Sequence, residues 1–177
     1  MMDDAQKRME TLKKAMAIEL KEKGFYLAAA EAAVNPVAKQ LFERLALEED
    51  VHAERFKAIE AELSKGHDWP VAVAAPSSGG AHLKAVVSAF NKGASPKDVV
   101  AARSELDAMK QAMAKELEAY DMYRTRASET GSQAEKKFYT TLAGEERGHH
   151  LALLDSYEYL TDPAGWYTVK EKWTLEG

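Results

Sequence analysis

Apolar side chains recur at helical spacing through much of this chain. In the first thirty residues, Met9, Leu12, Met16, Leu20 and Leu27 are separated by three, four or seven positions. A period of about 3.6 residues places such positions near one face of a helix. The pattern therefore predicts a first amphipathic helix from about residue 4 to residue 33.

Helix-breaking residues divide the rest of the chain into three further helical segments. Asn35 and Pro36 interrupt the first pattern, and proline suits the first turn of a helix but not its interior. Gly66 and Gly131 are typical stop signals. A capping box is expected at Ser104, with Asp107 as its acidic member. The expected helices span about residues 36–65, 104–129 and 132–159.

Two segments depart from the helical pattern. Between about residues 66 and 103, prolines, serines and glycines cluster around one short helix expected at 81–91. Antiparallel neighbouring helices need loops of only about 2–8 residues, so this segment is expected to cross the length of the bundle. The final segment, 160–177, carries Trp166, Tyr167 and Trp173.

These elements predict an all-α fold. Two helical hairpins joined by the long crossover would form a four-helix bundle over residues 1–159. The crossover makes the second and third helices parallel. The segment 160–177 is expected to be a short C-terminal tail, packed on the bundle or on a partner subunit.

Composition excludes several classes of protein. The 177-residue chain has 24 Lys and Arg against 29 Asp and Glu, which disfavours a nucleic-acid partner. It has no cysteine, so disulfides, thiolate-bound iron–sulfur clusters and a rubredoxin-type electron relay within the chain are excluded. The acidic N-terminus lacks the apolar core of a signal peptide, and no apolar run approaches the roughly 20 residues that span a membrane. A cytoplasmic location without a membrane partner is expected.

The two halves of the chain carry the same pattern of acidic and imidazole side chains. Glu19 is followed thirty residues later by Glu49, and Glu49 is followed by His52. A constant offset of 97 residues maps this set onto Glu116, Glu146 and His149. Val34, halfway between the first two glutamates, lies beside one predicted turn, and Gly131 lies at the equivalent point of the second half. Both glutamates of each hairpin are therefore expected at the same height, about 22 Å from the turn.

Four carboxylates and two imidazoles at this spacing indicate a site for two metal ions. Residues at i and i+3 share a helix face, so each Glu–His pair can hold one ion. Four carboxylates balance two divalent cations, and mixed oxygen and nitrogen ligands suit iron, manganese or zinc. Ferritin-like di-iron and di-manganese bundles use this ligand set. An isolated Glu–His pair would more often lie on a helix surface, but two pairs related by one offset favour the metal site.

The motifs around these residues resemble the rubrerythrin family of the ferritin-like superfamily. AIEL at 17–20 and GFY at 24–26 resemble its first helix, and LEEDVHAE at 47–54 resembles its second. AGEERGH at 143–149 repeats the second motif. The resemblance implies a ferritin-like bundle that binds two metal ions, most often iron. It also implies reduction of hydrogen peroxide or dioxygen with electrons from an external donor, such as a rubredoxin-type protein.

Three features depart from related families. Rubrerythrins proper carry a cysteine-rich domain that this sequence lacks, and an extra glutamate where this chain has Ala119. Glu22 lies one turn after Glu19 and is either a further ligand or, as its neighbouring lysines suggest, a solvent-facing carboxylate. Bacterioferritins hold haem through a methionine next to the second-helix glutamate. Asp50 occupies that position, so no haem is expected.

Two tyrosines also obey the offset of 97. Tyr26 and Tyr123 lie seven residues after Glu19 and Glu116, and are expected either to contact ligand carboxylates or to gate electron transfer. Their alternative role is that of ordinary core aromatics.

The sequence thus favours a di-iron oxidoreductase acting on peroxide or dioxygen. Iron storage or detoxification through ferrous oxidation is one alternative, and a structural metal-binding bundle is another. The sequence leaves open which two glutamates would bridge the metal ions, Glu49 and Glu146 or Glu19 and Glu116. The aromatic tail indicates a homodimer, because a free tail should not expose so much apolar area.

Overall fold

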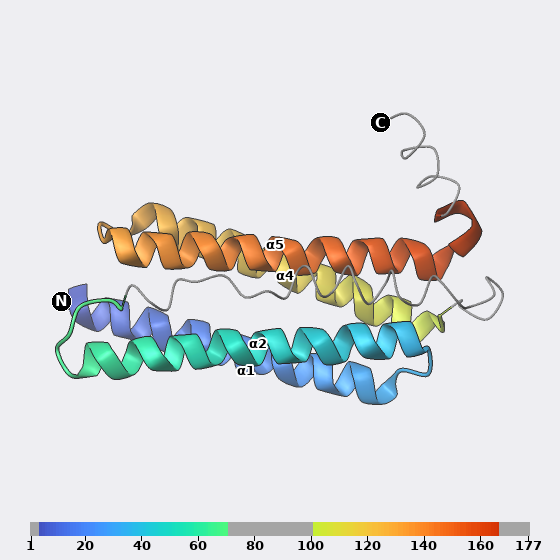
Figure 1. Ribbon diagram of the computed structural model, residues 1–177, viewed down its shortest axis with the longest axis horizontal. Helices are drawn as coiled ribbons and strands as arrows, with labels where there is room; N and C mark the ends of the chain where they lie inside the picture. The colour runs from blue at the N-terminus through green and yellow to red at the C-terminus, as the bar shows by residue number, and fades with distance from the viewer. Residues whose placement is uncertain (1–3, 71–100, 167–177) are drawn as a thin grey trace.

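Four long helices form the protein. In the computed structural model, residues 4–70 and 101–166 are described, and this part of the chain contains no strand. The helices are α1 (Asp4–Ala32), α2 (Pro36–Ser64), α4 (Arg103–Glu129) and α5 (Gln133–Thr161). They form an all-α four-helix bundle (Figure 1), which confirms the predicted fold class.

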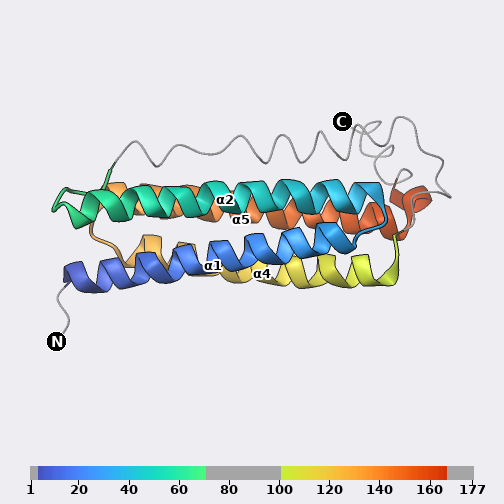
Figure 2. The same cartoon turned by 90° about the horizontal axis from the view of Figure 1, so that it is seen from below.

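The bundle consists of two antiparallel hairpins packed on one another. Helix α1 packs along α2, and α4 packs along α5. Helices α2 and α4 start at the same end of the bundle and run in the same direction (Figures 1 and 2), as the long crossover predicts. Most of that crossover, including the short helix expected at 81–91, lies outside the described residues.

The turn of the first hairpin is tied to the start of α4 by one glutamate. Asn35 caps α2 by accepting hydrogen bonds from the backbone N–H groups of Val37 and Ala38. Glu105 Oε1 accepts from the N–H groups of Val34 and Asn35 at 2.7 and 2.6 Å. Its Oε2 accepts from Ala102 N at 2.6 Å. This one carboxylate therefore holds the two hairpins in register.

The expected capping box at Ser104 is wrong. Helix α4 begins at Arg103, with Ala102 at the N-cap position. The acidic side chain that bonds back to the cap backbone is that of Glu105, while Asp107 lies half-exposed near Arg103.

The opposite end of the bundle is closed by the segment that follows α2. Gly66 has a φ of 79°, a left-handed conformation that glycine adopts without steric cost, and it ends the helix where the sequence predicts. The chain then places Trp69 against Phe138 and Tyr139 of α5, with ring centroids 5.5 and 5.8 Å apart. The first residues of the crossover therefore help to seal this end.

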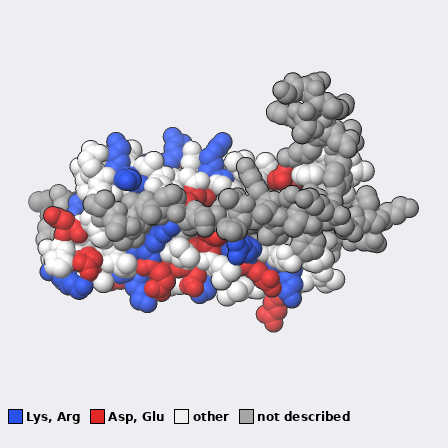
Figure 3. Space-filling view, viewed as in Figure 1, with Lys and Arg blue, Asp and Glu red and all other residues white. Residues whose placement is uncertain are grey.

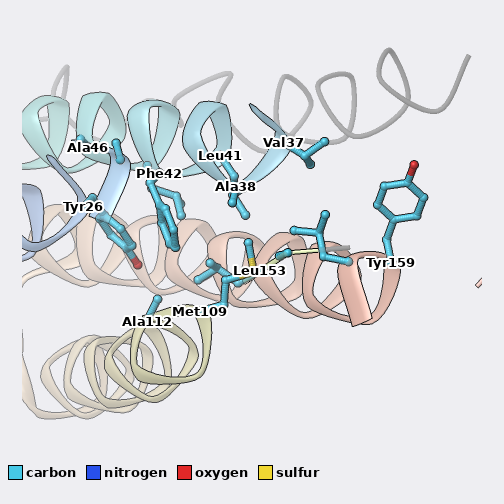
Figure 4. Close-up of a cluster of buried hydrophobic side chains, with 14 residues drawn as sticks. Tyr26, Val37, Ala38, Leu41, Phe42, Ala46, Met109, Ala112, Leu153 and Tyr159 are labelled. Carbon is cyan, nitrogen blue, oxygen red and sulfur yellow. The ribbon is translucent and has the colours of Figure 1, made fainter. Parts of the chain in front are cut away.

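Two apolar clusters fill the bundle on either side of its centre. One, at the end where the first hairpin turns, includes Tyr26, Leu41, Phe42, Met109 and Leu153 (Figure 4). The other, toward the far end, includes Leu12, Phe56, Ile59, Phe138 and Leu142. The helix positions between them carry the acidic and imidazole side chains that the offset relates.

Two positions of the predicted apolar face of the first helix lie on the surface instead. Leu20 and Leu27 of α1 are 48% and 50% exposed. The buried face of α1 carries Leu12, Glu19 and Tyr26, which are also spaced by seven residues. None of the helices in the described residues is long and apolar enough to cross a membrane.

The start of the C-terminal tail contacts α5. The Trp166 ring lies edge-on to Tyr159, with centroids 5.3 Å apart, and its indole N–H donates to Asp155 Oδ1 at 3.1 Å. Tyr167, Trp173 and the rest of the tail lie outside the described residues.

Candidate metal centre

All six residues related by the offset meet in the middle of the bundle. They are almost completely buried, with exposed fractions of 0–1%. Each of the four helices contributes at least one of them: Glu19, Glu49, His52, Glu116, Glu146 and His149. Because each hairpin turns near the midpoint of its two glutamates, the side chains reach the same height from both directions.

The six side chains form two overlapping groups of four. Glu19, Glu49, His52 and Glu146 offer ligand atoms that all lie within 4.8 Å of one another. The second group, within the same limit, consists of Glu49, Glu116, Glu146 and His149. Glu49 and Glu146 therefore belong to both groups, whereas Glu19 and Glu116 each belong to one.

The two shared carboxylates divide their oxygens between the groups. His52 Nδ1 lies 3.1 Å from Glu49 Oε2 and 3.1 Å from Glu146 Oε1. His149 Nδ1 lies 3.3 Å from Glu49 Oε1 and 3.3 Å from Glu146 Oε2. The imidazole rings themselves stack with centroids 5.5 Å apart. The two groups therefore adjoin one another and share two carboxylates.

The cluster is electrostatically strained when it holds no cation. Burial, reinforced by the nearby charge of Glu146, raises the pKa of Glu19 well above its usual value. Burial also raises the pKa of Glu116. Burial alone would lower the pKa of His52 and His149, but the surrounding carboxylates raise both well above the usual value. Protons therefore compensate the acidic cluster, and a metal ion must displace them to bind.

The shared carboxylates stay ionised. Burial acts to raise the pKa of Glu49 and of Glu146, but close contacts with the two imidazoles outweigh it and lower both pKa values. Glu49 Oε1, Glu116 Oε2 and both oxygens of Glu146 lie near the imidazoles but make no well-aligned hydrogen bond with any described residue. Buried anionic oxygens whose hydrogen bonds are not made are unfavourable unless a cation balances them. The donor set thus fits a pair of divalent metal ions.

A comparison with protein families agrees with this geometry. A family model described as Rubrerythrin matches residues 10–157. The chain belongs to the rubrerythrin family. Comparison with curated proteins and with solved structures found no match.

The two tyrosines of this rubrerythrin-family chain bond to the Glu–His cluster across the hairpins. The Tyr26 hydroxyl of α1 donates to Glu116 Oε1 of α4. The Tyr123 hydroxyl of α4 donates to Glu19 Oε1 of α1. Burial and the neighbouring carboxylates raise the pKa of both phenols, so the hydroxyls keep their protons. Each tyrosine thereby fixes one oxygen of a glutamate that belongs to a single group.

Glu145 and Arg55 also support this rubrerythrin-family site, although neither was predicted to have a role in it. Glu145 Oε2 lies 3.3 Å from His52 Nε2, the ring nitrogen that faces away from the cluster. Arg55 Nη1 in turn donates to Glu145 Oε2 at 2.7 Å. A carboxylate on the outer nitrogen fixes the orientation of a metal-binding imidazole. The position of Glu145 directly before Glu146 is the sequence feature that could have indicated this supporting role.

Glu22 requires a correction. It is 5% exposed, so its interpretation as a solvent-facing carboxylate is wrong. Burial, followed by the charges of Glu49 and Glu146, raises its pKa to about 7. Its Oε2 makes no hydrogen bond with another described residue. The offset of 97 maps Glu22 onto Ala119, the position where related rubrerythrins carry their extra glutamate, so this chain has a buried carboxylate in the opposite hairpin.

Proposed function

We propose that this protein holds two iron ions and reduces hydrogen peroxide or dioxygen with electrons from an external donor. The observation that carries this proposal is the pair of four-residue groups sharing Glu49 and Glu146. Glu19 and His52 would complete one iron site, and Glu116 and His149 the other. Membership of the rubrerythrin family supports iron over manganese or zinc.

The residues around the site have separate tasks in this proposal. When bound, a pair of ferrous ions supplies the two electrons that, with two protons, reduce hydrogen peroxide to two molecules of water. Glu49 and Glu146 would each contribute to both ion sites, because both residues belong to both groups. Tyr26 and Tyr123 hold Glu116 and Glu19 in place through their hydroxyls. The apolar clusters above and below exclude water from the centre.

Electrons must reach the site from outside the chain. The sequence contains no cysteine, so it cannot hold the thiolate-bound iron of a rubredoxin-type relay. We infer that a separate redox protein, such as a rubredoxin-type protein, returns the oxidised centre to the ferrous state.

Stopped-flow oxidation of the ferrous-loaded protein tests the function directly. Anaerobic protein carrying ferrous iron should be oxidised by hydrogen peroxide faster than free ferrous iron under the same conditions. Repeating the experiment with dioxygen identifies the preferred oxidant. Oxidation no faster than that of free iron would contradict the oxidoreductase function, and continued uptake of iron beyond the paired site would indicate storage instead.

Glu22→Gln is expected to slow peroxide-driven oxidation by about tenfold, the lower range for changes next to metal ligands. The amide keeps the size of the side chain but removes a buried negative charge beside Glu49 and Glu146. Glu31→Gln, at an exposed position of the same helix, is the matched control. Equal rates for the wild-type protein and both variants in the stopped-flow assay would show that Glu22 has no role in the reaction.

The homodimer expected from the sequence has a candidate surface on the first hairpin. Leu20 and Leu27 of α1, together with Leu47 and Val51 of α2, are each 43–56% exposed. Such an apolar surface is typical of a contact between subunits. Light scattering of the full chain should give twice the mass of one chain, and Leu20→Glu combined with Leu47→Glu should halve it. A single-chain mass for the unmodified protein would contradict the homodimer.

A further inference from the structure

A basic groove lies on the outer side of the second hairpin, apart from the metal centre. Among the described residues, its walls come from α4 and α5 alone, and it has a volume of about 480 Å³. Small-molecule sites typically occupy about 300–1,000 Å³. Ala127, Ala143 and Gly144 form its apolar floor, and the hydroxyls of Ser128 and Thr140 line it as well. The groove is large enough for a ligand of the size of a nucleotide.

Three cationic side chains line this groove, and no acidic residue is among the described residues that line it. They are Arg124, Lys136 and Arg147, and none of them forms an ion pair with a described residue. The guanidinium groups of Arg124 and Arg147 lie instead 5.3 and 5.8 Å from the ring centroid of Tyr120. Several Lys and Arg side chains lie along the edge of the molecule formed by the second hairpin, and others lie among acidic side chains along the opposite edge (Figure 3). The groove therefore presents concentrated positive charge on a protein with a net charge of −5.

The first hairpin shows that the metal site does not require this groove. The offset of 97 maps Gly144 onto Leu47 and Arg147 onto Asp50. It also maps Tyr120 onto Lys23, whose Nζ lies 2.6 Å from Asp50 Oδ1. The first hairpin thus has a leucine side chain in place of the open floor and an ion pair in place of the free charge.

Gly144 is the residue that opens the groove. A Cβ atom added there would meet no other atom within 4 Å, so close helix packing does not explain the glycine. Glycine in a helix interior is otherwise destabilising relative to alanine. The absence of a side chain at this position leaves the space between Arg124, Arg147 and Tyr120 accessible.

We propose that this groove binds a phosphorylated small molecule of about nucleotide size. Guanidinium groups match the geometry of phosphate oxygens and bind them through paired hydrogen bonds. Lys136 adds a third positive charge, which favours a ligand with at least two negative charges. The apolar floor and the Tyr120 ring accommodate the flat or apolar body of the ligand. This binding site does not depend on the metal centre or on its proposed reaction.

Isothermal titration calorimetry of the full-length protein tests the proposal with three probes. ADP carries both a diphosphate and a flat ring system, pyrophosphate carries the charge alone, and adenosine carries the ring system alone. ADP should bind more tightly than pyrophosphate, adenosine should not bind, and added salt should weaken ADP binding. Equal heats from ADP and adenosine, or no binding of ADP up to millimolar concentration, would overturn the proposal.

Matched variants in the two hairpins locate the binding. Gly144→Leu gives the second hairpin the leucine of the first and should abolish ADP binding, while Lys136→Ala should weaken it about tenfold. Lys39→Ala changes the equivalent lysine of the first hairpin and should leave binding unchanged. Gly144→Leu could lower binding simply by destabilising the fold, which would show as a lower melting temperature. Arg124→Ala then serves as the second test, because it removes a positive charge from the groove without adding bulk. Unchanged ADP binding in both Lys136→Ala and Arg124→Ala would overturn the proposal.

Discussion

Glu49→Ala and Glu146→Ala are each expected to abolish the rapid oxidation of the ferrous-loaded protein by hydrogen peroxide. Each shared carboxylate directs one oxygen to each of the two groups. Its removal therefore takes a ligand from both ions at once and leaves their charge uncompensated. We expect a loss of more than about 100-fold, since changes to groups that only support metal ligands already cost about 10–100-fold.

The measurement is the stopped-flow rate of iron oxidation, corrected for the iron content of each variant. Glu54→Ala is the matched control on α2, because Glu54 is exposed and, among the described residues, its ion pair is with Lys57 at 3.2 Å. Circular dichroism should show that all variants remain helical. A variant at Glu49 or Glu146 that reacts as fast as the Glu54 control would contradict the assignment of that residue as a bridge.

His52→Ala and His149→Ala are expected to lower the metal content from about two ions per chain to less than one. Each variant removes the single nitrogen ligand of one group. The second ion should also be held less tightly, because both groups share Glu49 and Glu146. The internal symmetry of the bundle makes the two variants equivalent.

Elemental analysis of anaerobically loaded protein gives the metal content directly. His150→Ala is the control, because His150 is adjacent in sequence but its Nδ1 lies 3.1 Å from the backbone oxygen of Met113, outside the cluster. The control should retain full metal content. Full occupancy in either His52→Ala or His149→Ala would show that the imidazole is not a ligand.

The six clustered residues could be identified from the sequence because helix geometry fixes their relation. A separation of thirty residues centred on a turn places two glutamates at one height, and a spacing of three places a histidine beside one of them. The pair of glutamates shared by the two groups could not be identified in this way. It depends on which carboxylates lie between the two imidazoles, and this is set by the rotation of each helix in the assembled bundle.

The apolar pattern of α1 misled because its buried face is partly polar. Glu19, Glu22 and Tyr26 are buried on the same helix as Leu12. The apolar spacing therefore pointed to Leu20 and Leu27, which are exposed. Glu22 shares a helix face with Glu19 because three residues separate them. That spacing indicated burial more reliably than the lysines on either side of Glu22.

Other features depend on contacts between distant parts of the chain. The Glu105 carboxylate bonds to backbone groups 70 and 71 residues away, which local capping rules cannot anticipate. The supporting role of Glu145 depends on Arg55, 90 residues away in the sequence. The basic groove could not be predicted locally either, because its lining residues come from both helices of the second hairpin and meet only in the folded bundle.

Mössbauer spectroscopy of the protein loaded with the Mössbauer-active iron isotope tests the central claim most directly. Combined with iron analysis, it reports how many ions the chain holds and whether they interact magnetically. After oxidation by peroxide, the protein should contain about two ferric ions per chain that are magnetically coupled, because Glu49 and Glu146 hold them side by side. A single iron per chain, or ferric ions that are magnetically isolated, would contradict the paired site.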